Sequence, residues 1–454
     1  MSATTEFNVP LSNARSYANL ARRDRTMGRL ILLFVILIFA EGILRKWLVP
    51  GGLQRVLYFI REPAIFAIYF YYLRNYPING RWVRPFLLYA FFVAALALLQ
   101  NVYWQRSPLI PALGVRFYAL YVPLAFIMAD VMTKAHLRKV IVLLLWVSIP
   151  IAVLVFVQFT QPPTSWINKG TVEGGMVFTV TGGIVRPYGP FTFANGQTLY
   201  SGLMAAITMI AWERRRDLSL PFWLVLSAGF STLSMMSVSG SRSAIGYVGL
   251  VMVFYTLAGF TSPVLAIGVR RTVTVVIAGI LAASIFVLMF PAAFDAMSTR
   301  QTTALRHEGS TIARAFSPIT MVVGAFDHVP IGGYGLGAGT NAARASSGVV
   351  GYTLGEGEWP RMINEGGAAA GLALLLIRQI FVVWLFLRCI AINRQTGDGS
   401  GVILMGFLMP VLVLGQITSG NQDLAFSWLT VGLCFGLLRH PMLAVHRNKR
   451  RSIR

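Results

Sequence analysis

The feature that most constrains this chain is a succession of apolar stretches, each about as long as a membrane-spanning helix. A helix that crosses the hydrocarbon core needs about 17–25 mostly apolar residues. Only 12% of the 454 residues are charged, against about 25% in soluble domains. The stretches do not alternate apolar and polar residues as barrel strands do. The sequence therefore excludes a soluble enzyme, a secreted disulfide scaffold, a disordered chain and an outer-membrane barrel. It predicts an all-α, polytopic membrane protein with twelve spans, at about 30–44, 54–73, 84–101, 110–131, 139–160, 191–212, 219–237, 242–260, 272–292, 364–387, 401–418 and 423–438.

The positive charges predict the orientation of these spans. An even number of spans puts both termini on one side. The segments on that side hold 24 Lys and Arg, and those on the other side hold 14. Cytoplasmic loops carry the excess of Lys and Arg, so we expect both termini in the cytoplasm. The predicted organisation is a tail (1–29), a single helical membrane domain (30–438) and a basic tail (439–454) that either touches anionic lipid or only anchors the topology.

The net charge of +23 would indicate a nucleic-acid partner in a soluble protein. Here the topology accounts for it, and we expect no nucleic acid. Cys389 and Cys434 lie in or beside apolar stretches without a metal or disulfide spacing, so we expect packing residues.

Charged residues near the spans concentrate in their outer halves. Ionisable groups at membrane depth are usually functional or paired, and two explanations stay open. One is a hydrophilic cavity that opens outwards. The other is snorkelling together with the local pairs Glu41–Arg45 and Arg61–Glu62. Arg378 lies in mid-span and fits a paired or snorkelling residue. The outer charges are Glu41, Arg45, Arg61, Glu62, Arg116, Arg186 and Arg242.

Two long outer segments, about 161–190 and 293–363, interrupt the short connections. Long loops in a compact fold are usually functional, so we expect the working surface on this side. Arg186 precedes a Pro/Gly turn and the Asn195-Gly196 start of a span, where helix N–H groups favour an anion. Arg242 stands among serines in a small-residue turn. A loop that merely caps the span is the alternative for Arg186.

The 293–363 loop contains an amphipathic stretch (311–327) with Arg314 on its first turn, followed by a Gly-rich bend. Glycine N–H groups there could face phosphate oxygens. The sequence GEGEWPRMINEGG then places Glu356, Glu358 and Arg361 just before a span. A carboxylate beside arginines suits a general base, and a solvated loop with local ion pairs is the alternative.

In order and topology, these segments resemble the O-antigen polymerase and O-antigen ligase family of bacterial inner-membrane glycosyltransferases. The resemblance covers roughly residues 180–385. It rests on the Arg…Gly-Pro-Phe…Asn-Gly segment, the Ser-Arg turn and the loop with its closing Glu-x-Gly. The matching loop residues are Arg314, His328, Pro330, Gly333, Gly335, Glu365 and Gly367.

The resemblance implies transfer of a glycan from undecaprenyl pyrophosphate to another glycan or to a lipid anchor, on the periplasmic side of the inner membrane. By position, Arg186, Arg242 and Arg314 match the family's phosphate-binding arginines, and we add Arg116 and Arg361. Arginines would replace a metal at the leaving pyrophosphate, so we expect neither metal nor cofactor. Expected partners are the lipid-linked donor, the acceptor glycan or lipid, membrane lipids and, as in such systems, a flippase and a chain-length regulator.

One departure from the family pattern concerns the base. Ligases commonly carry a His-Asn pair about nine residues before the Glu-x-Gly, and Glu356-Gly357 stands there instead. Glu356 or Glu358 would then be the base, with His307 and His328 as alternatives. The departure favours a polymerase over a ligase. A transporter or flippase of lipid-linked sugars would need a central basic cavity, and a non-catalytic scaffold is the remaining alternative.

Overall fold

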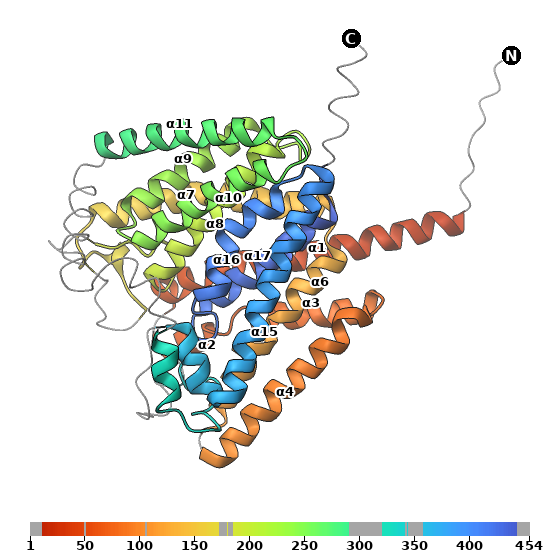
Figure 1. Ribbon diagram of the computed structural model, residues 1–454, viewed down its shortest axis with the longest axis vertical. Coiled ribbons are helices and arrows are strands. Elements are labelled where there is room, and N and C mark those ends of the chain that lie inside the picture. The colour runs from red at the N-terminus through yellow and green to blue at the C-terminus, as the bar shows by residue number, and fades with distance from the viewer. Residues whose placement is uncertain are drawn as a thin grey trace, which may run out of the picture.

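The protein was analysed as a computed structural model, shown in Figure 1. The structure describes residues 11–49, 51–104, 107–171, 179, 185–289, 320–340, 343 and 357–442. Within these ranges the regular structure is helical, and the only β pairing is an isolated bridge between Thr179 and Val185. The predicted all-α class is confirmed for this part of the chain.

Most of the helices follow one another with short connections. Two of them contain π-helical turns, η1 and η2, which continue α1 and α5. In order they are α1 (Leu11–Ile43), η1 (Leu44–Leu48), α2 (Leu53–Leu57), α3 (Glu62–Asn75), α4 (Gly80–Trp104), α5 (Leu109–Val115), η2 (Arg116–Leu120), α6 (Val122–Val131), α7 (Lys134–Thr160), the 3₁₀ turn η3 (Trp166–Asn168), α8 (Ala194–Glu213), α9 (Phe222–Val238), α10 (Arg242–Phe260), α11 (Ala266–Met289), α15 (Glu358–Thr396), α16 (Ser400–Leu414) and α17 (Asn421–Arg439).

Seven helical stretches in the described ranges are long and apolar enough to cross a membrane, and two shorter apolar helices, α9 and α16, accompany them. The chain therefore has the character of a membrane protein. Each of the twelve predicted stretches overlaps a helix or a consecutive series of helices, while the count of twelve spans stays a prediction. The seven stretches are Leu20–Leu48, Leu53–Asn75, Gly80–Trp104, Leu109–Val131, Lys134–Thr160, Arg242–Phe260 and Ala368–Thr396.

The core is built around α16 and α17, which lie between the α8–α10 group and α15 in Figure 1. Most side chains of both helices are buried, as expected for helices surrounded by other helices. A Cβ added to Gly406 of α16 would lie 2.7 Å from the Cα of Val251 of α10, so the glycine permits close backbone approach. By contrast, α4 runs along the edge of the bundle and exposes Leu88, Phe91 and Val102.

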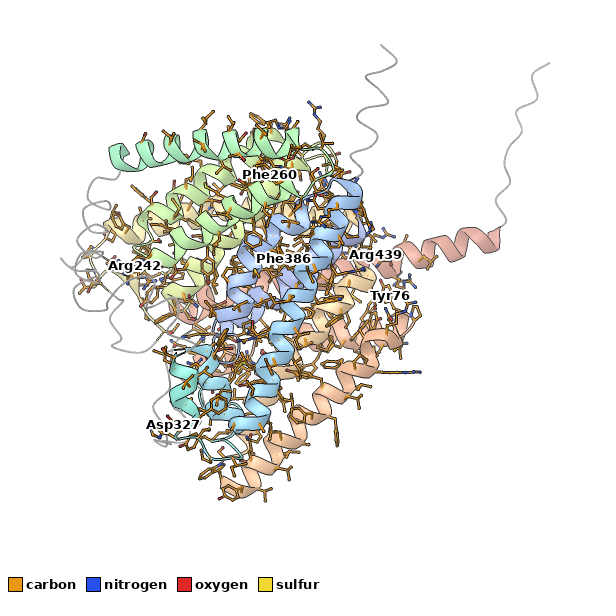
Figure 2. All side chains as sticks on the ribbon, in the orientation of Figure 1. Tyr76, Arg242, Phe260, Asp327, Phe386 and Arg439 are labelled. Carbon is orange, nitrogen blue, oxygen red and sulfur yellow. The ribbon has the colours of Figure 1, made fainter. Side chains whose placement is uncertain are left out.

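The bundle has two polar ends, which we name the Arg242 end and the Arg439 end after residues labelled in Figure 2. At the Arg439 end, Asp130 accepts hydrogen bonds from Tyr72 (2.7 Å) and Trp82 (2.8 Å), and Arg439 donates to the backbone carbonyl of Asp130. Tyr76 donates to Asp24 of α1 (3.0 Å). Residues from α1, α3, α6 and α17 therefore meet at this end.

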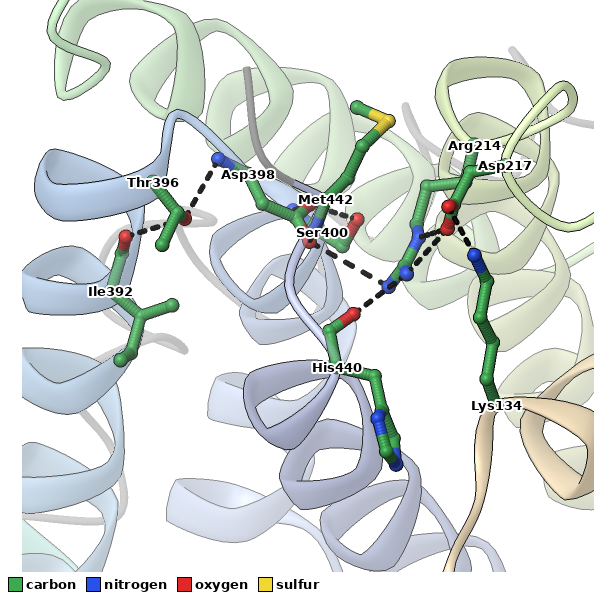
Figure 3. Close-up of polar contacts among 9 residues, drawn as sticks. All are labelled: Lys134, Arg214, Asp217, Ile392, Thr396, Asp398, Ser400, His440 and Met442. Atoms are coloured by element: carbon green, nitrogen blue, oxygen red, sulfur yellow. Dashed lines mark hydrogen bonds and ion pairs between the residues drawn. The ribbon is translucent and has the colours of Figure 1, made fainter. Parts of the chain in front are cut away.

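Figure 3 shows a second group of contacts among the connections that the sequence places on the cytoplasmic side. Arg214 is almost fully buried and donates to Asp217 (2.7 Å) and to the carbonyl of His440 (2.7 Å), and it lies 3.6 Å from Asp398. Lys134 also pairs with Asp217. Burial alone would raise the pKa of Asp217, but the hydrogen bonds from Lys134 and Arg214 hold that pKa below its usual value. These connections therefore form one cluster around Arg214.

Cys389 of α15 and Cys434 of α17 are buried, with their sulfur atoms 3.5 Å apart, and both are free thiols. The prediction that they are packing residues rather than a disulfide is confirmed.

Candidate functional site

The segment between α16 and α17 joins several elements at the Arg242 end. We call residues 415–423 the connector; it comprises the link between the two helices and the first three residues of α17. The N–H of Thr418 donates to Glu358 of α15 (2.9 Å), and Arg361 donates to the hydroxyl of Ser419. Asp423 accepts from Asn195 at the start of α8 (2.9 Å). The connector therefore holds the starts of α8, α15 and α17 together.

Glu358 lies inside this arrangement. Its side chain is 1% exposed, and its Oε1 accepts from Arg378 (2.7 Å) as well as from Thr418. Its Oε2 lies 3.6 Å from Arg361 and accepts no hydrogen bond from the residues that the structure describes. Oε2 is therefore a buried carboxylate oxygen beside the Arg361 guanidinium. The sequence predicted that Arg378 is either paired or snorkels to the interface, and the structure shows that it pairs with Glu358.

The Gly-rich bend wraps around Glu365. The N–H groups of Gly337 (3.2 Å) and Gly339 (2.7 Å) and the hydroxyl of Tyr118 (2.8 Å) all donate to its carboxylate. Gln100 of α4 binds the carbonyl of Glu365 (2.8 Å). The expectation that these glycine N–H groups face phosphate is therefore wrong for Gly337 and Gly339, because an internal carboxylate already occupies them.

A positive φ angle allows the close contact between the bend and α15. Gly367 has φ +82° and interrupts the helical geometry of α15. A Cβ there would lie 2.2 Å from the carbonyl oxygen of Ile331. Only glycine fits such a position. The Glu-x-Gly motif thus has a structural explanation. The carboxylate of Glu365 binds the bend, and the absence of a side chain at Gly367 lets the bend pack closely against α15.

The segment that carries Arg186 is fixed from α1 and α7. The ammonium of Lys46, in η1, donates to the carbonyls of Gly189 (2.7 Å) and Phe191 (3.2 Å). Gln158 accepts from the N–H of Gly189 (2.7 Å). Sequence analysis assigned no role to Lys46 or Gln158, yet both side chains position the segment before α8.

The outer charges of the first four predicted spans form a buried network. Glu41 pairs with Arg45 (2.9 Å) as the i,i+4 spacing predicts, so this pair is confirmed. The predicted Arg61–Glu62 pair is wrong: Arg61 pairs with Glu41 (3.0 Å), and Glu62 pairs with Arg116 (2.5 Å). Neighbours in the sequence point to different partners here because each helix turns successive side chains about 100° apart.

Asn421 of the connector ties this network to the site. Its amide donates to Glu41 (2.9 Å), and its carbonyl oxygen accepts from Arg116 (2.5 Å). Arg116 also lies over the ring of Tyr58, 4.8 Å from the centroid. The guanidinium of Arg116 is thus engaged within the protein, and its role in binding substrate stays a prediction.

The other predicted site residues divide into three groups. Arg186 and Arg242 are partly exposed, and Arg242 is the first residue of α10. Arg361 is buried beside Glu358. His328 is exposed after the helical turn 321–326. Arg314, Glu356 and His307 lie outside the described residues, so the structure says nothing of the predicted roles of these three.

Sequence analysis missed Asn421 and Asp423. The signal was present, because the polar triplet Asn-Gln-Asp opens an otherwise apolar stretch. Their partners, Glu41 and Asn195, lie more than two hundred residues away. Spacing along the chain gives no way to find such pairs.

In the described ranges, no group of three or more His, Cys, Asp or Glu side chains could hold a metal ion, and the prediction of metal-free chemistry stays a prediction. Comparison of the chain with models of protein families, with curated proteins and with solved structures finds no match.

Proposed function

We propose that this protein is a polymerase of a cell-surface polysaccharide, such as O-antigen or an exopolysaccharide, in a bacterial inner membrane. It would transfer a glycan from undecaprenyl pyrophosphate to a growing glycan on the periplasmic side. The twelve-span topology with cytoplasmic termini and a periplasmic 293–363 loop belongs to this proposal. The sequence resemblance supplies the reaction, and the arrangement of the Arg242 end supports it.

The observation that supports the proposal is the link, through the connector, between the start of α8 and the turn of α15 that carries Glu358 and Arg361. Arg186 precedes α8, Arg242 opens α10, and Arg361 lies with Glu358 in the first turn of α15. Asn195 and the connector tie α8 to α15 through Asp423 and Thr418. Arg361 thus lies beside the Glu358 carboxylate, and the connector joins this turn of α15 to the start of α8, which Arg186 precedes.

The chemistry follows from these groups. Breaking the bond to the lipid pyrophosphate places negative charge on the leaving phosphate. Arginine forks stabilise such charge by paired hydrogen bonds. A carboxylate takes the proton of the acceptor hydroxyl as that oxygen attacks the sugar carbon. Oε2 of Glu358 is the described group that suits this role, with Glu356 as its rival.

The test is complementation of a strain that lacks the gene, with the surface glycans separated on a gel. Wild type should restore long chains, and Arg242→Ala should leave single repeat units. Arg270→Ala is the matched control, because Arg270 is exposed on α11 away from the Arg242 end, and it should behave as wild type. Protein levels in the membrane are measured for each variant.

Other outcomes reject the proposal in distinct ways. Long chains that accumulate on the lipid carrier without reaching their final anchor identify a ligase. Lipid-linked repeat units that stay in the cytoplasm identify a transporter. Full-length chains with Arg242→Ala at normal protein levels refute the phosphate-binding role of that arginine.

A further inference from the structure

Arg61 is the most completely buried arginine of the described residues and the least satisfied. Its side chain is 0% exposed, at the N-cap of α3. Its Nη2 lies 3.0 Å from Glu41, and neither Nε nor Nη1 has a hydrogen-bond partner within the described ranges. Buried donors normally find an acceptor, since leaving one without costs free energy. Arg61 therefore has capacity for a further ligand.

The charges around Arg61 do not balance. Three guanidinium groups, those of Arg45, Arg61 and Arg116, share two carboxylates, those of Glu41 and Glu62. Glu41 also accepts from Asn421, and Oε1 of Glu62 also accepts from Tyr121 (2.9 Å), whereas Oε2 of Glu62 has no hydrogen-bond partner among the described residues. A buried positive charge without a counter-charge is costly. The cluster is therefore one negative charge short of balance, which a bound anion would supply.

The backbone here is unusual at two places. Arg45 lies in the π-helix η1, and Arg116 opens the π-helix η2. π-helical turns inside α-helices occur frequently at functional sites. Two such turns, from separate spans, bring basic side chains to one cluster. The two π-helical turns are an observation independent of the unsatisfied donors of Arg61, and both observations indicate this cluster as a functional site.

One side of the cluster lies near the surface, at Arg45. Its side chain is 15% exposed, and its Nε also has no hydrogen-bond partner among the described residues. The adjacent α2 exposes Leu53 and Val56, and no atoms lie within 4 Å of a Cβ built at Gly52. Arg45 is therefore the partly exposed member of the cluster, on the side of α2.

We propose that Arg45 and Arg61 bind the phosphate group of a ligand in the buried cluster around Glu41. The planar guanidinium fork matches two phosphate oxygens at once, and two neighbouring forks supply the charge for a phosphate. Glu41 orients both arginines from behind. The ligand is either a lipid with a phosphate headgroup or free inorganic phosphate. The site does not depend on the proposed polymerase activity, because anion binding is measured directly.

The test is isothermal titration of inorganic phosphate into the full-length protein, purified in detergent and stripped of lipid. Wild type should show saturable binding that chloride does not reproduce. Arg61→Gln should weaken this binding about tenfold or more, since it removes a charge-assisted fork. Glu41→Gln should tighten it, because the cluster gains net positive charge while an amide oxygen remains to hold Arg45.

Arg271→Gln is the matched control. Arg271 is also buried with unpartnered nitrogens, but it faces a single carboxylate, Glu213, at 3.4 Å, and therefore has no excess charge. Its substitution should leave phosphate binding unchanged. If Arg61→Gln does not fold, Arg45→Gln and Glu41→Gln still give opposite shifts. No saturable binding to wild type, or equal binding to all variants, would overturn the proposal.

The two sources of phosphate separate in a competition. Nanodiscs that contain phosphatidic acid should displace inorganic phosphate if the site takes a lipid headgroup, and discs of phosphatidylcholine alone serve as the reference. If phosphate binds but phosphatidic acid does not compete, the ligand is the free ion. Either result supports a phosphate site at Arg61.

Discussion

Replacement of Gly42 by alanine tests how closely α1 must approach the segment that carries Arg186. A Cβ at Gly42 would lie 1.9 Å from the carbonyl oxygen of Pro190. Ordinary contacts between such atoms are about 3.5 Å, so the two segments must separate by more than about 1 Å. The carbonyls of Gly189 and Phe191, on either side of Pro190, would then move away from Lys46.

The magnitude follows from three contributions. Weakening hydrogen bonds to a charged donor costs about 1.5–3 kcal/mol, and overpacking costs about 1–3 kcal/mol. Alanine gains about 1 kcal/mol over glycine in a helix. We therefore expect Gly42→Ala to lower the free energy of unfolding by about 2–4 kcal/mol. With an unfolding entropy of about 2 cal/mol/K per residue over 454 residues, this lowers the melting temperature by about 2–4 °C.

The assay is thermal unfolding of the detergent-solubilised protein, followed by tryptophan fluorescence at one scan rate, because membrane proteins often unfold irreversibly. Gly249→Ala in α10 is the matched control, since nothing lies within 4 Å of a Cβ at that position. Its melting temperature should equal that of wild type or exceed it. Equal melting of Gly42→Ala and Gly249→Ala would refute the close-contact reasoning.

Three further predictions concern other contacts. Lys46→Met should cost about 1–3 kcal/mol and reduce polymer formation, whereas Lys46→Arg should recover part of both, measured by melting and glycan gels. Glu365→Gln turns one acceptor oxygen into a donor that faces N–H groups; we expect a loss of about 2–4 kcal/mol and faster proteolysis within 332–340. Asp217 has a lowered pKa, so its contribution to stability is present above its unfolded value of 3.8 and is lost as the pH falls through the folded value. Asp217→Asn should flatten the pH dependence of melting in that acid range, and an unchanged slope would contradict the assignment.

The positions of the helices could be predicted because apolar length is a local property of the sequence. The stretch 242–260 was predicted as a span, and α10 has the same limits. The stretch 364–387 was too short at both ends, since α15 runs from Glu358 to Thr396. Its polar ends stay helical because they pack against the connector and α16, which hydropathy does not report.

The site could be predicted only in part, because its contacts join residues far apart in the chain. Nearness in sequence suggested an Arg61–Glu62 pair, yet the partner of Glu62 is Arg116 from another helix. The glycines of the bend were recognised as close-approach residues, but Glu365 was not recognised as their partner. The type of each charge can be read from the sequence, whereas its partner depends on how the helices pack.

The position of α17 has a consequence for the order in which the protein assembles during synthesis. This helix emerges from the ribosome after the others described here, yet it lies at the centre of the bundle. Until it inserts, Glu41 and Asn195 lack Asn421 and Asp423, and Arg214 lacks the carbonyl of His440. Until α17 is present, these polar side chains of the earlier helices therefore lack the hydrogen-bond partners that α17 and His440 supply. A chain that ends before α17 would leave these groups without the partners that this helix supplies.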